Sequence, residues 1–251
     1  MDRPRSPLQW AFQQGKFEIA RLLISRGACV AHVSAWGWTP AFYLWPAGEK
    51  GTVSRTNYLD IFGNDASIEW EVFDVTGWTV LHRVAAFGFA DELEALIRFG
   101  ANPNTCALPL RWTALHHAVY YGNHETFLIL ISPKYQACVH SPDARGWTLL
   151  HIAASAGHDS IVRHLLSLNA DHTHLSIPFM SHMPEVLLNR AVTPGEAALA
   201  QSRERYRQYL CAIHDYGLIE LQSKEAEEEE EEDEDEGDDI FVDAEEDFVL
   251  Y

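Results

Sequence analysis

Apolar residues recur at helical spacing through most of this chain, in short segments that end at glycine. Residues 146–170 are the clearest example. Their first half predicts a short helix from Thr148 to Gly157, because glycine ends a helix by adopting a positive φ without strain. Their second half predicts a helix with one apolar stripe, formed by Ile161, Val162, Leu165 and Leu166. Such a stripe needs a neighbour, so the pattern predicts pairs of short helices that stack on other pairs.

The same pattern recurs at a nearly constant interval. A threonine, a histidine three residues later and a glycine nine residues later occur as Thr79, His82 and Gly88, as Thr113, His116 and Gly122, and as Thr148, His151 and Gly157. Each threonine can cap a helix while the imidazole reaches back to it, as in a capping box. Successive threonines are 34 residues apart (79 to 113) and 35 residues apart (113 to 148). The chain therefore contains an internal repeat.

This repeat resembles the ankyrin repeat, whose period is about 33 residues. The resemblance is carried by Gly77-Trp78-Thr79-Val80-Leu81-His82, by Trp112-Thr113-Ala114-Leu115-His116 and by Gly146-Trp147-Thr148-Leu149-Leu150-His151. It implies an all-α fold, an ankyrin-repeat solenoid of stacked helix-turn-helix units with β-hairpin loops. The array would occupy residues 1–221, with repeats near 4–30, 36–65, 76–104, 110–134 and 145–170 and a degenerate or capping unit at 191–216.

Two of these copies depart from the pattern. Near 4–30, Ser6 replaces the threonine and Gln9 the histidine, whereas the copy near 36–65 keeps Thr39 but lacks the histidine. We expect an insert at 46–56 and a finger or short added helix at about 171–191. Repeat arrays usually begin with a unit whose outer face is polar. Either the polar side of residues 1–24 serves as that cap, or the chain is a fragment of a longer array.

The charge is confined to one end of the chain. The formal net charge is −19, but Glu225 to Asp247 contains 17 of the 37 acidic residues and no basic one, so residues 1–224 are nearly neutral. Such a run cannot bury apolar surface and repels itself, which predicts a disordered acidic tail over 222–251. A neutral body with an acidic tail argues against direct binding of nucleic acid.

No pattern of residues indicates catalysis, a metal or a cofactor. The four cysteines form no CxxC pair, and glycine-rich phosphate loops and nucleophile motifs are absent. His82, His116 and His151 occupy the capping position, which explains them without chemistry. His172, His174 and His182 have no carboxylate or thiol pattern beside them and are interpreted as solvated loop residues. No segment reaches the length of a membrane span. We expect a non-enzymatic, cytoplasmic or nuclear monomer without a membrane contact.

The resemblance implies a binding surface made of hairpin tips and inner helices. The residue before the motif threonine is a tryptophan four times, at Trp38, Trp78, Trp112 and Trp147. These side chains either form an exposed ladder or close the seams between repeats. On the inner helices, Phe87, Tyr120 and Tyr121, together with Arg83 and His117, would make an aromatic and mildly basic concave face. The alternative is that they pack against neighbouring helices.

These observations favour a scaffold or adaptor that binds a protein partner. The alternative places function in the acidic tail, which could hold basic proteins such as histones or mask the array's own concave face. A third interpretation is an adaptor for protein degradation or part of a large signalling protein. The recognition positions of a repeat array do not name the partner.

Overall fold

The computed structural model describes residues 5–44, 59–62, 68–135, 137–176, 193–199, 201 and 203–216. Within these ranges no β-strand occurs, and a single antiparallel bridge joins Ala107 to Trp112. The elements are α1 (Pro7–Gln13), α2 (Phe17–Ser25), the 3-10 helices η1 (Pro40–Leu44) and η2 (Asp60–Phe62), α4 (Val80–Phe87), α5 (Ala90–Arg98), α6 (Ala114–Tyr120), α7 (His124–Ile131), α8 (Leu149–Ala156), α9 (Asp159–Ser167), α10 (Pro194–Leu199) and α11 (Arg203–Asp215).

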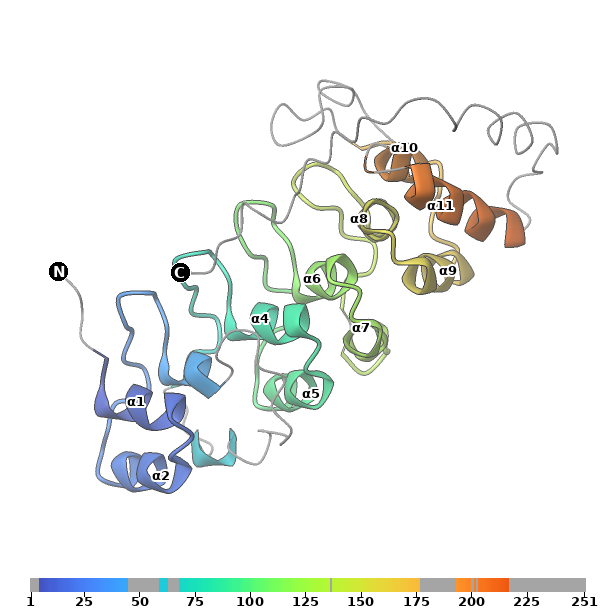
Figure 1. Ribbon diagram of the computed structural model, residues 1–251. Helices are drawn as coiled ribbons and strands as arrows, with labels where there is room; N and C mark the ends of the chain where they lie inside the picture. Colours follow the sequence, from blue (N-terminus) through green and yellow to red (C-terminus); the bar gives the residue numbers. More distant parts are fainter. Residues whose placement is uncertain are drawn as a thin grey trace.

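These helices form pairs that stand side by side in one row, with α1 and α2 at one end and α10 and α11 at the other (Figure 1). Each inner helix contacts the next inner helix, from α4 to α6 to α8 to α10. Among the outer helices, α5 contacts α7 and α9 contacts α11. The predicted all-α solenoid of stacked helix pairs is confirmed. The acidic tail and the insert at 46–56 lie outside the described residues, as does most of the expected finger at 171–191.

Each inner helix starts with a reciprocal cap formed by its first residues. The N–H of Thr79 donates to His82 Nδ1 at 3.1 Å, while the threonine side chain accepts from the backbone of His82. The pairs Thr113–His116 and Thr148–His151 repeat this arrangement, both at 3.2 Å. The first repeat achieves it with Ser6 and Gln9 and the last unit with Thr193 and Glu196, both at 2.8 Å. The motif therefore fixes where each helix begins.

The same capping side chains also bind the next hairpin. Because Nδ1 accepts a backbone hydrogen, the neutral imidazole of His82 carries its proton on Nε2, which lies 3.0 Å from the oxygen of Thr105 and 3.1 Å from that of Trp112. Gln9 Nε2 donates in the same way to the oxygens of His32, at 3.0 Å, and Trp38, at 2.8 Å. One polar side chain thus satisfies a helix start and joins two consecutive repeats.

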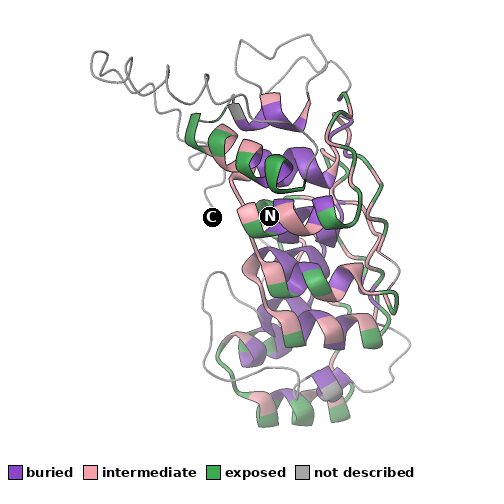
Figure 2. Cartoon of the chain, turned by 90° about the vertical axis from the view of Figure 1, so that its right-hand side faces the viewer, coloured by how far each residue is buried: buried purple, intermediate pink, exposed green. Residues whose placement is uncertain are grey.

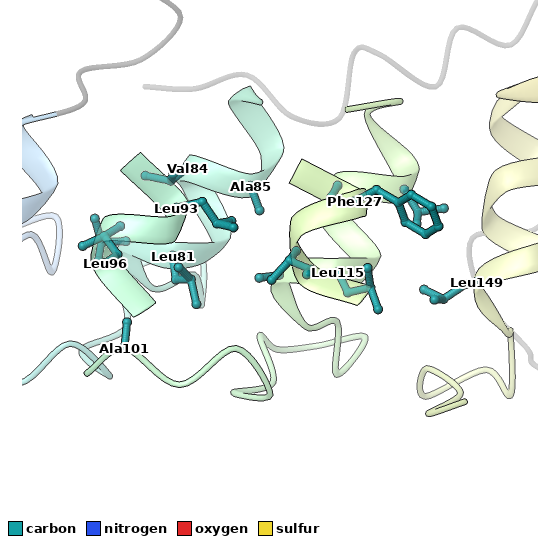
Figure 3. Close-up of a cluster of buried hydrophobic side chains, with 14 of the residues drawn as sticks. Leu81, Val84, Ala85, Leu93, Leu96, Ala101, Leu115, Phe127 and Leu149 are labelled. Carbon is teal, nitrogen blue, oxygen red and sulfur yellow. The ribbon is translucent and has the colours of Figure 1, made fainter. Parts of the chain in front are cut away.

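A continuous apolar core follows the row of helices (Figures 2 and 3). At its centre Leu93, Leu96, Leu115 and Phe127 are all 0% exposed and lie between the inner and outer layers. Burying a leucine contributes about 1.5–3 kcal/mol, and cutting one to alanine costs about 2–5 kcal/mol. Because each repeat contributes only a few such side chains, stability comes from stacking rather than from a single repeat.

The second repeat is degenerate, as its sequence indicates. In the described residues its inner helix is the short 3-10 segment η1, and Leu59 is helical directly before the 3-10 turn η2. Phe42 stands where the other repeats have histidine or glutamine, so Thr39 has no capping partner three residues later. Phe42 and Leu44 are nevertheless at most 1% exposed, so this repeat still contributes to the core. Of the predicted second helix near 58–62, the structure describes Leu59, which is helical, and the 3-10 turn Asp60–Phe62.

Candidate interaction surface

In two of the repeats, a single aspartate shapes the hairpin before the inner helix. Asp74 Oδ1 accepts hydrogen bonds from the backbone N–H of Thr76, at 2.9 Å, and of Trp78, at 3.0 Å. Asp143 repeats this with the N–H of Arg145, at 2.8 Å, and of Trp147, at 2.9 Å. An aspartate that satisfies the backbone of its own turn fixes the position of the tryptophan that follows.

Neighbouring hairpins lie in direct contact. The N–H of Val75 donates to the oxygen of Trp36 at 3.1 Å, and the N–H of Ala144 donates to that of Leu110 at 2.8 Å. At Gly37 the backbone has a φ of +77°, and an added Cβ would lie 2.7 Å from the Cα of Asp74. Only glycine satisfies both the positive φ and this close approach. The hairpins therefore form a row that runs alongside the row of helices.

The tryptophans before the motif threonines close the seams of this row. The Arg83 guanidinium lies 4.5 Å from the ring centroid of Trp38, and the His117 ring lies 4.3 Å from that of Trp78. In each pair, the tryptophan belongs to the preceding repeat. Of the two interpretations of these indoles, the structure supports seam packing. Trp147, which is 5% exposed, is too buried to contact a partner.

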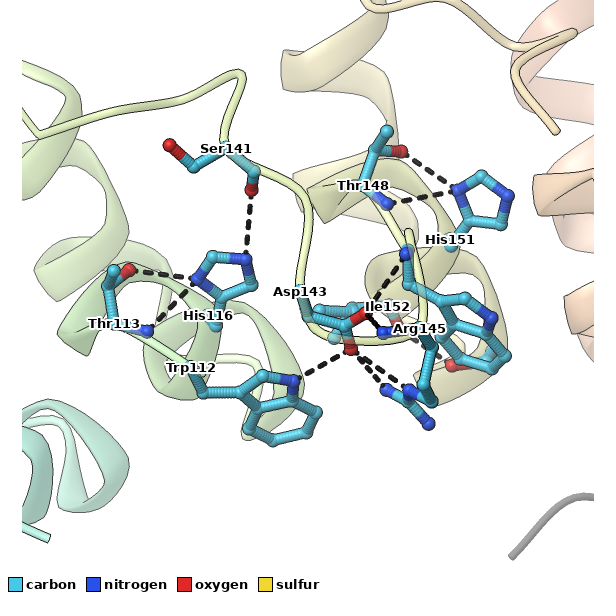
Figure 4. A network of polar contacts seen from close by, with 11 residues as sticks. Trp112, Thr113, His116, Ser141, Asp143, Arg145, Thr148, His151 and Ile152 are labelled. Carbon is cyan, nitrogen blue, oxygen red and sulfur yellow. Dashed lines mark hydrogen bonds and ion pairs between the residues drawn. The ribbon is translucent and has the colours of Figure 1, made fainter. Parts of the chain in front are cut away.

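A polar network joins the fourth and fifth hairpins (Figure 4). The indole Nε1 of Trp112 donates to Asp143 Oδ2 at 2.9 Å, and the Arg145 guanidinium donates to the same oxygen at 2.8 Å. Arg145 also stacks 4.0 Å from the centroid of Trp147. Because the Asp143 side chain is fully buried and paired, the network holds the hairpins rather than leaving a charge available for chemistry.

Arg83 and His117 are not on an accessible face, and the hypothesis that they line the concave surface is corrected. Each is 2% exposed. Arg83 Nη1 pairs with Asp74 Oδ2 at 3.4 Å, and burial lowers the pKa of Arg83 while Asp74 acts in the opposite direction. Burial also lowers the pKa of His117 well below its usual value, with a further contribution from His82, and neither ring nitrogen has a hydrogen-bond partner. The preceding hairpin covers both side chains.

The aromatic residues at the ends of the inner helices do reach solvent. Tyr120 is 37% and Tyr121 43% exposed, and Phe87, at the same level of the preceding repeat, is half-buried. The rings of Tyr120 and Tyr121 lie 5.1 Å apart, and Tyr120 also lies 5.1 Å from Trp112. We call Phe87, Tyr120 and Tyr121 the inner-face aromatics. They are fixed by packing on one side and open on the other.

A second group of exposed apolar side chains lies at the hairpin tips, which the sequence analysis did not name. It consists of Trp36, Phe73, Val75 and Leu108, which are between 42% and 65% exposed. The signal was present in the sequence, since these residues flank turn positions where polar residues are usual. The backbone bond from Val75 to Trp36 shows that two of the tips touch. We call this group the hairpin-tip residues.

The described residues contain no group of histidine, cysteine, aspartate or glutamate that could hold a metal ion. Burial lowers the pKa of His82 and of His116 to about 4, so both rings stay neutral as caps near neutral pH. The four cysteines are free and far apart in the sequence. No helix in the described part of the chain is long and apolar enough to cross a membrane.

Comparison with known proteins identifies the repeats. A model of three ankyrin repeats matches residues 44–139 and again 81–176, and a single-repeat model matches 5–35. Human protein phosphatase 1 regulatory subunit 27 is 49% identical over 63 residues, which are 25% of this chain and 40% of that protein. Notch-regulated ankyrin repeat-containing proteins are similar over 86 residues, 32% of this chain: the human protein is 35% identical over 71% of its length and protein A of Danio rerio 42% identical over 72%.

Proposed function

Because this chain belongs to the ankyrin-repeat family, we propose that it is a non-catalytic scaffold or adaptor, which binds a protein partner on the inner-face aromatics and the hairpin-tip residues. The observation that carries the proposal is the row formed by Phe87, Tyr120 and Tyr121, large side chains held in place by the fold and open to solvent. Rigid, half-exposed aromatic residues are typical of binding hot spots.

The test is capture of partners from a native lysate with the wild-type chain and with the triple variant F87A/Y120A/Y121A. We expect the variant to lose the specific partners at unchanged cooperative unfolding, since two of the three side chains are more than a third exposed. The matched control removes apolar side chains of similar exposure from the outer helices and their ends, at Leu128 and Leu168. Equal capture by the triple variant would refute this surface.

The similarity to a phosphatase subunit provides the first partner to test. The matched part spans 40% of that relative, so we treat regulation of protein phosphatase 1 as a narrower form of the proposal. Purified phosphatase is mixed with the wild-type chain and with the triple variant, and binding and phosphatase activity are measured. Binding that the triple variant abolishes supports the narrower form, and absence of binding at micromolar concentrations rejects it.

The acidic tail supports a second candidate function, binding of basic proteins. Seventeen acidic residues without a basic one between Glu225 and Asp247 would attract a cationic surface strongly at low salt and weakly at high salt. Deleting residues 225–251 separates the two candidates. Loss of histone binding upon deletion, with capture by the array unchanged, supports the tail as a separate site.

A further inference from the structure

The outward face of the first repeat carries large apolar side chains in solvent. Trp10 on α1 is 50% exposed, and Ile19 and Leu22 on α2 are 52% and 54% exposed. The three side chains belong to the end of the row, where α1 and α2 have no helix pair before them in the described residues (Figure 1). An apolar end face of this kind is unusual for the first unit of a repeat array, which normally carries polar residues there.

Equivalent positions in the later repeats show what this face is built for. Trp10 lies five residues before the glycine that follows its inner helix. The residues at this position in the later repeats are Arg83, His117 and Ile152, which are 2%, 2% and 1% exposed. Four residues after the same glycine, Ile19 corresponds to Glu92, Thr126 and Ile161, which are 8%, 0% and 0% exposed. In the later repeats, the preceding repeat covers these positions. Trp10 and Ile19 of the first repeat are exposed in the structure, so they form a surface on which another unit can stack.

In the described residues, the opposite end of the row offers no complementary surface. There α11 packs against α8 and α9, and Arg205 Nη1 donates to the oxygen of Ser155 at 2.6 Å. Tyr209 and Ile213 point into this contact and are each 4% exposed. Head-to-tail stacking of two chains would require this end to be open. The packing of α11 therefore favours an isologous pair, in which the same face of each copy meets.

The charges around Leu22 are arranged for such a pair. Glu18 lies four residues before Leu22 and Arg26 four residues after it, and all three are exposed. Residues four apart lie on the same side of a helix. When two α2 helices pack antiparallel about a two-fold axis at Leu22, Glu18 of each copy faces Arg26 of the other. The sequence is therefore complementary to itself in this orientation.

We propose that the chain forms a homodimer through α1 and α2 of the first repeat, with Leu22 at the two-fold axis. The proposed dimer is an alternative to the monomer expected from the sequence.

Sedimentation of the full chain between about 1 and 100 µM tests the proposal, since this range detects a dissociation constant on the order of micromolar. We expect the mass to approach twice that of one chain at the upper concentration, and L22E to remain monomeric throughout. L128E, at an exposed position of α7, is the matched control and should dimerise as the wild type does. Unchanged far-UV circular dichroism of L22E shows that the fold is intact.

A charge exchange tests the orientation. E18R places arginines opposite each other at both contacts and should weaken the dimer several-fold, whereas E18R/R26E restores opposite charges and should recover it. These substitutions are at exposed positions and keep the apolar residues in place. A wild-type chain that is monomeric up to 100 µM, a dimer unaffected by L22E, or a failure of E18R/R26E to recover the dimer overturns the proposal.

Discussion

His158 Nε2 donates a hydrogen bond to the backbone oxygen of Tyr120 at 2.8 Å. The bond joins the start of one outer helix to the end of the preceding inner helix. Asn123 does the same one repeat earlier, where its side-chain amide donates to the oxygens of Ala85 and Ala86 at 2.9 and 2.7 Å. The last carbonyls of a helix have no hydrogen-bond partner within it. Here the following repeat supplies a donor to them, next to the inner-face aromatics.

We expect H158A to lower the free energy of unfolding by about 1 kcal/mol, since it leaves the carbonyl of Tyr120 to water. Urea denaturation followed by circular dichroism measures the change. His140 is exposed, and H140A should alter stability by less than about 0.5 kcal/mol. Equal effects of the two substitutions would contradict the role given to His158.

Acidification should destabilise the array. Burial lowers the pKa of His82 and His116 from 6.5 to about 4 and that of His117 well below 6.5. The unfolded chain therefore binds protons that the folded chain does not. Stability is complete above pH 6.5 and decreases as the pH falls towards 4, by roughly 1 kcal/mol per pH unit for each histidine. Urea denaturation at pH 7.5, 6 and 5 tests this, and equal midpoints would contradict it.

Replacing His117 should stabilise the protein. Both of its ring nitrogens are buried without a partner, and an unsatisfied buried polar group costs about 1–3 kcal/mol. Isoleucine occupies the equivalent position in the fifth repeat, as Ile152. We expect H117I to raise the free energy of unfolding at pH 7 by roughly 1 kcal/mol, because lost contacts with Trp78 and Trp112 offset part of the gain. Its stability should also vary less with pH; a lower midpoint would argue that the ring is needed.

A pair of glycines separates backbone strain from close approach. Gly37 and Gly27 both have positive φ, at +77° and +84°, but an added Cβ would lie 2.7 Å from the Cα of Asp74 at Gly37 and meets nothing within 4 Å at Gly27. G27A should cost about 1 kcal/mol. G37A should cost roughly 1–3 kcal/mol more, because the two hairpins must move apart. Thermal unfolding of both variants measures the difference, and equal losses would show that the hairpins yield freely.

Removing only Arg83 from the ion pair between Asp74 and Arg83 should destabilise the fold more than replacing both residues with neutral ones. Both side chains are at most 3% exposed, so R83M leaves a buried carboxylate without its cation and should cost about 3 kcal/mol. D74N/R83M keeps an acceptor for the hairpin N–H groups and removes the charge, and it should recover at least half of that loss. A double variant as unstable as R83M alone would show that the charge is not the cause.

The local part of this fold could be predicted from the sequence. A threonine and a histidine three residues later interact within a single helical turn, so the caps at Thr79, Thr113 and Thr148 follow from adjacent residues. Glutamine in place of histidine at Gln9 was predictable for the same reason. The weak second repeat also followed, because Thr39 has no capping partner three residues later.

The candidate surface could be predicted only in part, because burial depends on the neighbouring repeat. Arg83 follows the motif histidine and resembles an exposed basic residue in the sequence, but Trp38 of the preceding repeat covers it. Tyr120 and Tyr121 lie at the open end of the helix and remain exposed. The exposure of Trp10 and Ile19 could not be predicted, because the equivalent positions of the later repeats are covered by a neighbouring repeat.

The second repeat gives this array a soft link. Its inner helix, Pro40–Leu44, is a 3-10 helix, in which the geometry of the backbone hydrogen bonds is poorer than in the inner α-helices α1 and α4 on either side. In a linear assembly, tension is transmitted from each unit to the next, so a pull applied to the two ends would open the weakest unit first. The helix pair α1 and α2 would then separate as a unit, while the repeats from Val80 onwards stayed folded and kept the inner-face aromatics.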